Sequence, residues 1–499
     1  MQAVADVAQK PQALAGVPGL RGVVVKESAW LVGANAVSRA LGLIRGVLVA
    51  RLLSPSEYGS LTTLVLAAFY LQLFDGGVGY GTLRQIPWLD GLNKEQEAIQ
   101  LQRQVIGWEM LVGLASVAAI AALAWLIRPS GERLPLILWL ILPGYVLGEL
   151  LRNAVQSYLQ SRRRLHQLRV SMVVHAVLDL LLTSVFAWRW GLTGAMAGLS
   201  LTALSVTGFL VWQSRSEPVW RPMRLPWSTA RTLAGIGLPI MLQTLIWFNM
   251  TNVDKIVILS TLDRAALAYY AIAQSIGASL LLISGAVTRV NGPLMIGRLA
   301  ETSDPAALYP MVRRVTTVLA YGLPILTALV WCVSPLFFGW LLPRYQDAVP
   351  LLDVIGVGMS AIGITFGVSF LYVAMGRQML NTLMLFGSVC LTAALSLLLL
   401  ALGWGVLGVA VASTISSGIY LTVFLVAGFR MLGRSGLRLA ADVGRLLLPV
   451  GLCALGAAVL VRSGGQAAAS RTWVSVGMLA GLFALGCWRS RALLRGQAL

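Results

Sequence analysis

The first long apolar stretch of the chain contains three arginines. Residues 38 to 53, "SRALGLIRGVLVARLL", carry Arg39, Arg45 and Arg51 among residues that are otherwise nearly all Leu, Ile, Val, Ala and Gly. A guanidinium group presents its donors as a planar fork that fits the oxygens of a carboxylate or a phosphate. A charge at the bilayer centre costs about 2.5 to 3.5 kcal/mol, so we expect these cations to face a cavity or a partner.

Helical geometry separates the three arginines. At about 100° per residue, a face about 120° wide holds Asn35, Ser38, Arg39, Gly42, Arg45 and Gly46. Arg51 lies opposite, at the end of the stretch, where its side chain reaches the lipid headgroups. The sequence therefore predicts that Arg39 and Arg45 line a cavity. The alternative is a structural ion pair, for which the acid must come from another stretch because this one has none.

Polar residues recur at helical spacing in later apolar stretches. One polar stripe contains Tyr145, Glu149, Arg152 and Gln156, and further candidates are Asp179, Gln243, Asp254, Lys255 and Arg289. The predicted substrate-binding residues are these nine together with Arg39 and Arg45. Because Glu149 and Arg152 have the spacing of an intrahelical ion pair, a purely structural network that also uses Asp75, Asp179 and Asp254 is the alternative.

The composition is that of a membrane protein. Of the 499 residues, 58% are hydrophobic and 11% are charged, with a mean hydropathy of +0.80, whereas a soluble domain has about 25% charged residues. Apolar runs of roughly 20 residues, the length of a membrane-spanning helix, follow one another almost to the C-terminus. We predict an all-α integral membrane protein with about fourteen transmembrane helices, the first near residues 28 to 52, and no sizeable soluble domain.

The basic residues predict the orientation. Most of the 38 Lys and Arg residues fall in segments that lie on one side of the membrane in this span order. The positive-inside rule assigns that side to the cytoplasm and predicts that both termini are cytoplasmic. The net charge of +19 therefore requires no nucleic acid as a partner. The basic loop "SRRRLHQLR", residues 161 to 169, is suited to contact anionic membrane lipids.

Two internal similarities indicate a repeat. "VARLLSPSEYGSLTTL" (49 to 64) resembles "VILSTLDRAALAYYAI" (257 to 272), and "GLTGAMAGLS" (191 to 200) resembles "GVLGVAVAST" (405 to 414). Two parallel halves with a substrate site between them are known among transporters. The predicted organisation is a cytoplasmic segment (1–27), an N-lobe of six spans (28–213), a cytoplasmic linker (214–233), a C-lobe of six spans (234–430), and two final spans with a short tail (431–499).

Signals for catalysis are few. The sequence contains no GxSxG elbow, HExxH motif or phosphate-binding glycine loop with lysine, and only two histidines. The four cysteines lie in apolar runs without CxxC spacing, so neither a disulfide framework nor a metal site is expected. We expect a protein that is not an enzyme and that binds no cofactor.

Three stretches carry a family resemblance. They are "ARLLSPSEYG" (50 to 59), "FDGGVGYGTLRQ" (74 to 85) and "GLPIMLQTLIWFNMTNVDKIVILSTLDRAALAYYAIAQSI" (237 to 276). They resemble the polysaccharide exporter branch of the multidrug/oligosaccharidyl-lipid/polysaccharide (MOP) flippase superfamily, which includes the O-antigen repeat-unit flippases of the Wzx type. The resemblance extends roughly from residue 28 to residue 430.

The resemblance implies two pseudo-symmetric six-helix lobes around a central cavity that opens alternately to either side. It also implies that the substrate is an undecaprenyl-diphosphate-linked oligosaccharide, which is moved across the bacterial cytoplasmic (inner) membrane. The resemblance allows for a polysaccharide polymerase or assembly complex as a partner. Lipid II flippases share the fourteen spans and the first-span arginines and are the nearest alternative. Cation-coupled multidrug antiporters resemble the chain less, and a polymerase or ligase is disfavoured because such enzymes have one large periplasmic loop.

Overall fold

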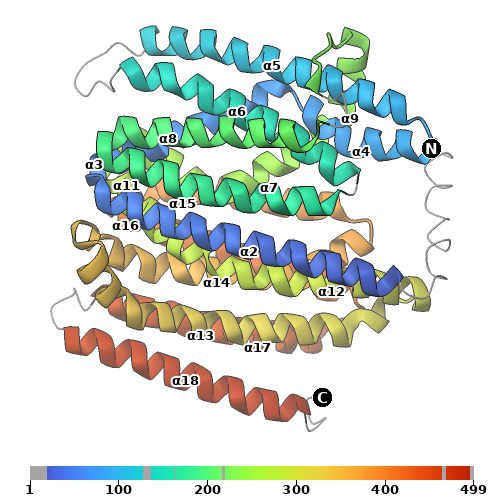
Figure 1. Ribbon diagram of the computed structural model, residues 1–499. Helices are drawn as coiled ribbons and strands as arrows, with labels where there is room; N and C mark the ends of the chain where they lie inside the picture. The colour runs from blue at the N-terminus through green and yellow to red at the C-terminus, as the bar shows by residue number, and fades with distance from the viewer. Residues whose placement is uncertain (1–19, 127–135, 163, 216–219, 463–467, 495–499) are drawn as a thin grey trace.

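The chain folds into a bundle of long α-helices (Figure 1). The computed structural model describes residues 20–126, 136–162, 164–215, 220–462 and 468–494, and no β-strand occurs among them. The helices are α2 (Leu20–Leu52), α3 (Pro55–Gln72), α4 (Val78–Gly91), α5 (Glu95–Leu126), α6 (Leu136–Ser161), α7 (Leu165–Leu178), α8 (Ser184–Gln213), α9 (Trp227–Met250), α10 (Val253–Thr261), α11 (Arg264–Ala278), α12 (Leu280–Thr302), α13 (Tyr309–Leu341), α14 (Ala348–Ala374), α15 (Gln378–Ala401), α16 (Gly405–Met431), α17 (Gly436–Arg462) and α18 (Ala468–Leu494). Short turns of other helix types are η2 (Leu73–Asp75), η3 (Asp179–Thr183), η5 (Pro305–Leu308) and η6 (Pro343–Tyr345).

This is a multi-pass membrane protein. Ten helical segments of the described chain are long and apolar enough to cross a membrane, and the bent pair of α3 and α4 makes an eleventh. The segment from Leu165 to Gln213 contains the non-helical residues Trp190 and Gly191, so the chain turns back there and crosses twice. With α2 and α18, the helices make the fourteen predicted crossings. The first begins at Leu20 rather than at residue 28, and the predicted segment before it lies, up to residue 19, outside the described residues.

Two of the spans change direction in ways that the sequence pattern did not predict. The second span bends by 53° between α3 and α4, where Gly76 and Gly77 have φ of +65° and +82°, values that favour glycine. The seventh span is interrupted between α9 and α10, where Thr251 and Asn252 have φ of −115° and −139°. In membrane proteins, irregular backbone is found where it is buried in protein or lines a cavity.

The helices form two lobes. Helices α2 to α8 are called the N-lobe and helices α9 to α16 are called the C-lobe; most packing is within each set, and the main contacts between the sets are α3 on α11 and α4 on α9. Helices α17 and α18 pack on α13 and α14 of the C-lobe, and α18 lies at the edge of the bundle (Figure 1). The described start of α2 and the end of α18 lie at the same end of the bundle, the right-hand end in Figure 1.

The repeated turns lie together where the lobes meet at the left-hand end of Figure 1. Ser54 caps α3 in a capping box with Glu57, and the Asp263 side chain caps α11 by accepting from the backbone N–H of Ala266 at 2.7 Å. Gly59 of α3 packs on the backbone of α11, since a Cβ at Gly59 would lie 1.9 Å from the carbonyl oxygen of Arg264. A glycine is therefore required for the lobes to approach this closely.

A second glycine contact joins the lobes at the other end, between α4 and α9. A Cβ at Gly237 would lie 1.9 Å from the carbonyl oxygen of Gly77, and a Cβ at Gly81 would lie 2.5 Å from that of Leu233. Backbone therefore lies directly on backbone, as at the small-residue contacts of other membrane helices. The lobes are joined at both ends, and the space between these two contacts contains the cavity described below.

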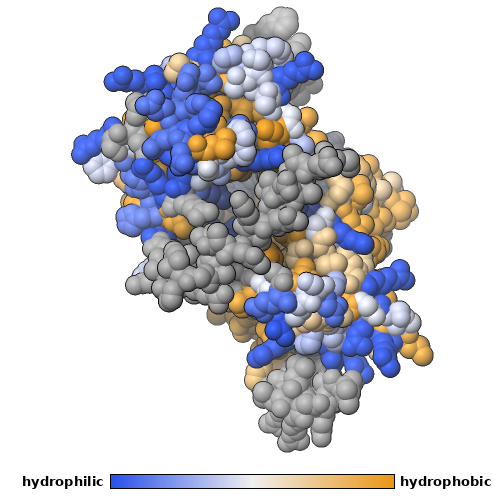
Figure 2. All heavy atoms as spheres, turned by 90° about the vertical axis from the view of Figure 1, so that its right-hand side faces the viewer, coloured by the Kyte–Doolittle hydropathy of each residue, from blue (hydrophilic) through white to orange (hydrophobic). Residues whose placement is uncertain are grey.

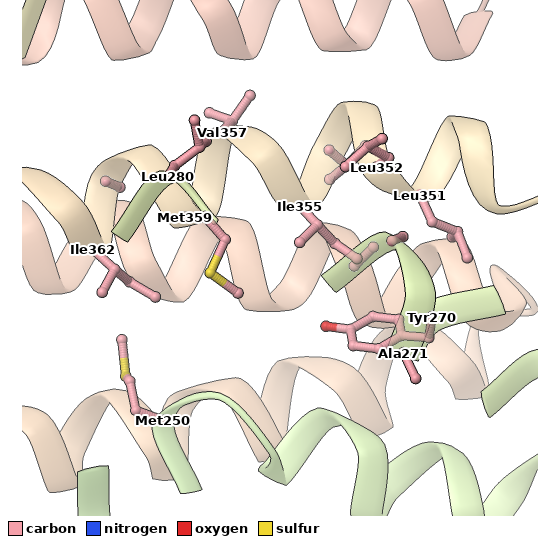
Figure 3. Packing of buried hydrophobic residues seen from close by; sticks show 14 of the residues in the cluster. Met250, Tyr270, Ala271, Leu280, Leu351, Leu352, Ile355, Val357, Met359 and Ile362 are labelled. Atoms are coloured by element: carbon pink, nitrogen blue, oxygen red, sulfur yellow. The ribbon is translucent and has the colours of Figure 1, made fainter. Parts of the chain in front are cut away.

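Helix α14 forms the centre of the C-lobe. Its residues are buried along nearly the whole length, as expected of a helix that is apolar on all sides. Figure 3 shows Ile355 and Met359 of α14 near Tyr270 of α11 and Met250 of α9. Helices α11 and α12, which carry cavity residues of the C-lobe, pack directly on this central helix.

The surface agrees with a membrane environment. Figure 2 looks onto the right-hand end of Figure 1, where hydrophilic residues gather in two patches. Large exposed tryptophans lie near helix ends, among them Trp212 at the end of α8, Trp227 at the start of α9 and Trp340 at the end of α13. Tryptophan is enriched where membrane meets water, so these residues mark the two interfaces.

Candidate functional site

A polar cavity lies between the lobes. It has a volume of about 950 Å³ and is lined by residues of α2 to α7 and of α9 to α12. Two smaller cavities adjoin it and share lining residues with it: the first shares Asn35, Asn252, Lys255, Ser275 and Arg289, and the second shares Arg45, Tyr58 and Ser275. One, of about 520 Å³, is called here the cation pocket, and it is lined by Asn35, Arg39, Lys255 and Arg289 among others. The other, of about 410 Å³, lies between α2 and α11 with the start of α12 and is called the α2–α11 cleft.

The polar face predicted for the first span faces these cavities. Arg39 lines both the cation pocket and the α2–α11 cleft, and Arg45 lines the central cavity and the cleft. Asn35 and Gly42 also line them. Arg51 is exposed and lies outside all three linings. Helix α2 is continuous over this stretch, which is why simple helical geometry places its residues correctly.

Arg45 has the ion-pair partner that the alternative interpretation required. Its Nε donates to Asp179 Oδ2 at 3.0 Å, and Thr183 Oγ1 donates to Asp179 Oδ1 at 3.0 Å. Asp179 is buried and begins the π-helical turn η3 in the fifth span. Asp179 therefore lies behind the cavity wall and holds Arg45 in place, rather than lining the cavity itself.

The stripe of the fourth span lines the central cavity. Tyr145, Glu149, Arg152 and Gln156 all contribute to the lining. Arg152 Nε donates to Glu149 Oε1 at 3.0 Å, and its Nη1 donates to Gln156 Oε1 at 2.9 Å. His175 Nε2 lies 3.7 Å from the same Glu149 oxygen. The charge of Arg152 is therefore largely compensated, and this wall presents hydrogen-bonding groups rather than net charge.

The cation pocket is different, because no acidic residue belongs to its described lining. Arg39 and Arg289 are exposed to it, and neither forms an ion pair within the described part of the chain. Lys255 Nζ donates to Asn252 Oδ1 at 3.0 Å. Trp247 and Phe366 form one side of the pocket, with their rings edge to face at 5.8 Å. Three cations from three helices thus surround a space that fits an anion.

Two of the predicted residues lie elsewhere. Gln243 is exposed outside the three cavities, and Asp254 is buried in the C-lobe, where Tyr270 and Gln274 donate to its carboxylate. An unbroken helix over residues 242 to 259 would place Gln243 and Asp254 on one face by its spacing. The interruption at Thr251 and Asn252 turns α10, so that Lys255 faces the cavity and Asp254 faces the core.

The sequence interpretation also missed cavity residues. Glu109 of α5, Asn252 of the break and Tyr58 of α3 line the central cavity. Glu109 is an acidic residue inside a predicted span, and that alone marks an intramembrane site of interest. Nothing in the local pattern distinguishes Asn252 or Tyr58. Among the described residues, no group of three or more His, Cys, Asp and Glu is arranged to hold a metal ion.

Comparisons with known proteins relate this architecture to a family. Residues 48–350 match the family described as "Polysaccharide biosynthesis protein", and no curated protein matches the chain. The solved structure of the lipid II flippase MurJ in an inward closed conformation aligns with a TM-score of 0.70 at 15% identity, covering 93% of this chain and 99% of that one. An inward-facing multidrug resistance MATE transporter of the MOP superfamily aligns with a TM-score of 0.66 at 15% identity, covering 79% and 94%.

A MOP superfamily transporter from Pyrococcus furiosus aligns with a TM-score of 0.55 at 16% identity, covering 83% of this chain and 96% of that one. At these identities the structural likeness is one of fold. The family match covers more than half of the sequence, and the fold agrees over most of the chain. The protein therefore belongs to the polysaccharide biosynthesis protein family and has the fold of the MOP-superfamily transporters.

Proposed function

We propose that this protein is a flippase that moves a lipid-linked oligosaccharide, attached through a diphosphate to undecaprenol, across the cytoplasmic membrane of a bacterium. The substrate enters from the cytoplasmic leaflet and leaves from the periplasmic leaflet. The lobes open alternately at their two ends, and no covalent bond is made or broken. Family membership supports a role in polysaccharide synthesis, and the cavities support the three chemical parts of such a substrate.

The cation pocket carries the proposal. A diphosphate presents several anionic oxygens, and arginine binds them through a fork of donors. Arg39, Lys255 and Arg289 provide three positive charges around a space of about 520 Å³ without an acid in the described lining. Charges in the membrane interior are expensive and normally serve a ligand or a partner. Arg39 and Arg289 form no ion pair within the described chain, and the Lys255 ammonium donates to a neutral amide, so an anionic group is the ligand that they fit.

The other two cavities suit the remaining parts of the substrate. The central cavity, of about 950 Å³, is at the upper end of the usual range for ligand sites, about 300 to 1,000 Å³. Gln72, Asn153 and Gln160 are among its polar lining residues and are able to bind sugar hydroxyls. The α2–α11 cleft is lined by apolar residues such as Val47, Ile272 and Leu282, which suit a polyprenyl chain.

Transport is tested in vesicles that contain the purified protein and a labelled undecaprenyl-diphosphate-linked oligosaccharide. We expect the label to become accessible to a glycosidase added outside at a rate well above that of protein-free vesicles. The same assay is run with lipid II in parallel. Movement of lipid II without movement of the oligosaccharide would instead assign the protein to peptidoglycan precursor transport.

The proposed lack of catalysis gives a separate prediction. Lipid-linked oligosaccharide incubated with the protein is expected to be recovered with unchanged mass and chain length, because the cavity offers charge and hydrogen bonds without a recognisable catalytic arrangement. Mass spectrometry of the recovered lipid checks this. Reproducible formation of longer glycans, or transfer of the glycan to another acceptor, would contradict the proposal.

The proposed orientation also predicts a result. Reporter fusions in the segment after α6, near residue 162, and after the end of α18 are both expected to report a cytoplasmic location, because basic residues concentrate at this end. An alkaline phosphatase fusion, active only in the periplasm, is the matched opposite reporter. Phosphatase activity at either position would overturn the orientation.

A further inference from the structure

Two buried carboxyl groups lie in contact at the bend of the second span. Asp75 ends η2, directly before Gly76 and Gly77, and Glu109 lies in α5. Their side chains are 5% and 3% exposed, and both contribute to the lining of the central cavity. The two side chains are within hydrogen-bonding contact of each other. Both lie over Gly79, where a Cβ would be 2.8 Å from Glu109 Oε1 and 3.3 Å from Asp75 Oδ2.

Each carboxyl group of the pair has an oxygen without a donor. Asp75 Oδ2 accepts from the backbone N–H of Gly79 at 3.0 Å, but Asp75 Oδ1 and Glu109 Oε2 are buried and lack a hydrogen-bond partner among the described residues. A buried polar atom without a hydrogen-bond partner lowers the stability of the folded protein by about 1 to 3 kcal/mol, and by more if the atom is charged. The pair therefore lacks a positively charged or donating group that would satisfy both oxygens.

The surrounding helices do not provide that group. From α4, Tyr80 faces the pair, and from α5 the Trp108 Nε1 donates to the backbone oxygen of Asp75 at 3.1 Å. From α6, the charged residues of the cavity are Glu149 and Arg152, which pair with each other. No lysine, arginine or histidine in the described chain forms an ion pair with Asp75 or Glu109.

Two carboxylates in contact cannot both remain ionised in a buried site, and such pairs hold a shared proton. The shared proton gives the pair one O–H donor and removes one negative charge. We propose that Asp75 and Glu109 form a proton-binding site, which takes one proton from water in the cavity and returns it to water when the lobes separate between α4 and α9.

The position of the pair supports the link to movement. Asp75 is followed by Gly76 and Gly77, and Gly77 packs directly on Gly237 of α9 at the contact between the lobes. A change in the bend between α3 and α4 therefore moves Asp75 relative to Glu109 in the neighbouring helix α5. The coupling of this proton to transport rests on the proposed function, whereas proton binding itself does not.

Proton binding is tested without any substrate. Infrared spectra of the purified protein are recorded between acidic and alkaline pH, and the carbonyl band of a protonated carboxyl group is followed. We expect the wild type to show a band that disappears on deprotonation, and Asp75→Asn and Glu109→Gln each to lack it. Asp442→Asn is the matched control. Asp442 is also a buried acid, but it accepts from Tyr309 at 2.8 Å and lies 3.7 Å from Arg434 Nε, away from the cavity, so its removal should leave the band unchanged.

The coupling is tested in vesicles with an imposed pH gradient. We expect the gradient to change the transport rate of the wild type and of Asp442→Asn, and to have no effect on the transport rate of Glu109→Gln. Asp75→Asn provides the same comparison if Glu109→Gln does not reach the membrane.

Three outcomes would contradict the proposals. The proton site would be overturned in favour of a sodium site if the wild type lacks the infrared band and its thermal stability rises in sodium chloride but not in choline chloride. Retained gradient dependence in both variants would overturn the coupling. A normal infrared result without transport of the oligosaccharide would instead reject the proposed substrate.

Discussion

Replacement of Arg39 by alanine is expected to slow transport strongly while the amount of protein in the membrane stays near normal. Arg39 is exposed in the cation pocket and forms no ion pair within the described chain, so its loss leaves no acid without a partner. A hydrogen bond to a charged group contributes about 1.5 to 3 kcal/mol, which corresponds to a transport rate lower by about 10- to 100-fold. Arg39→Lys should recover part of this, because it keeps the charge but loses the fork.

Replacement of Arg45 by alanine is expected to give the opposite result, with less protein in the membrane. The change leaves the buried Asp179 without its partner at 3.0 Å, and removal of one member of a fully buried pair costs about 3 to 5 kcal/mol, which is an upper value here because the Arg45 side chain is 26% exposed. Adding Asp179→Asn should restore the amount of protein in the membrane, because it removes the unpaired negative charge.

Export and abundance are measured together for the Arg39 and Arg45 variants, with Arg51→Ala as the control. Normal export by Arg39→Ala would reject the anion site, and normal abundance of Arg45→Ala would reject a structural role for the pair.

Replacement of Gly237 by alanine is expected to prevent the lobes from closing between α4 and α9. The new Cβ would lie 1.9 Å from the carbonyl oxygen of Gly77, and the obstacle is backbone, which cannot rotate away. Overpacking costs about 3 kcal/mol at the upper end of the usual range, which lowers the population of the closed state by about 100-fold. Transport should fall by a similar factor, because the cycle passes through this state.

The matched control is Gly235→Ala, in the same helix, where an added Cβ meets nothing within 4 Å. Its transport should equal that of the wild type. A cysteine at position 275, which lies on all three cavities, reports the conformation in a background without the native cysteines. In Gly237→Ala, a thiol reagent that cannot cross the membrane should react faster from the side where α9 begins. Equal reactivity and equal transport in both glycine variants would show that the contact is not required.

The sequence predicts which residues line a cavity where a helix is regular. The faces of α2 and α6 follow from their spacing alone, and Arg39, Arg45, Glu149 and Arg152 lie on the cavities as that spacing predicts. Asp254 does not line a cavity, because Thr251 and Asn252 interrupt the span and no local residue marks the interruption as glycine or proline would. Substrate binding by any of these residues stays a prediction. The bend at Gly76 and Gly77 is marked by two glycines, but glycines in a membrane span also serve close helix packing, so the sequence alone does not distinguish a bend there.

Pairing between distant segments could not be predicted from the sequence. Several acids were available to Arg45, and its contact with Asp179 depends on how α2 packs against η3. The contact between Asp75 and Glu109 likewise joins two spans whose relative rotation is set by packing. The composition predicts that buried charges need partners, but tertiary structure determines which partner each of them has.

The pair of Arg45 and Asp179 has a consequence for synthesis of the protein. The two residues are 134 positions apart in the chain, and at about 5 to 20 residues per second a ribosome needs about 7 to 27 s to add the intervening residues. During that interval the first span holds an arginine whose partner, Asp179, has not yet been made. The newly made helix must therefore wait beside the insertion machinery or among anionic headgroups, and it reaches its final depth only when the fifth span arrives.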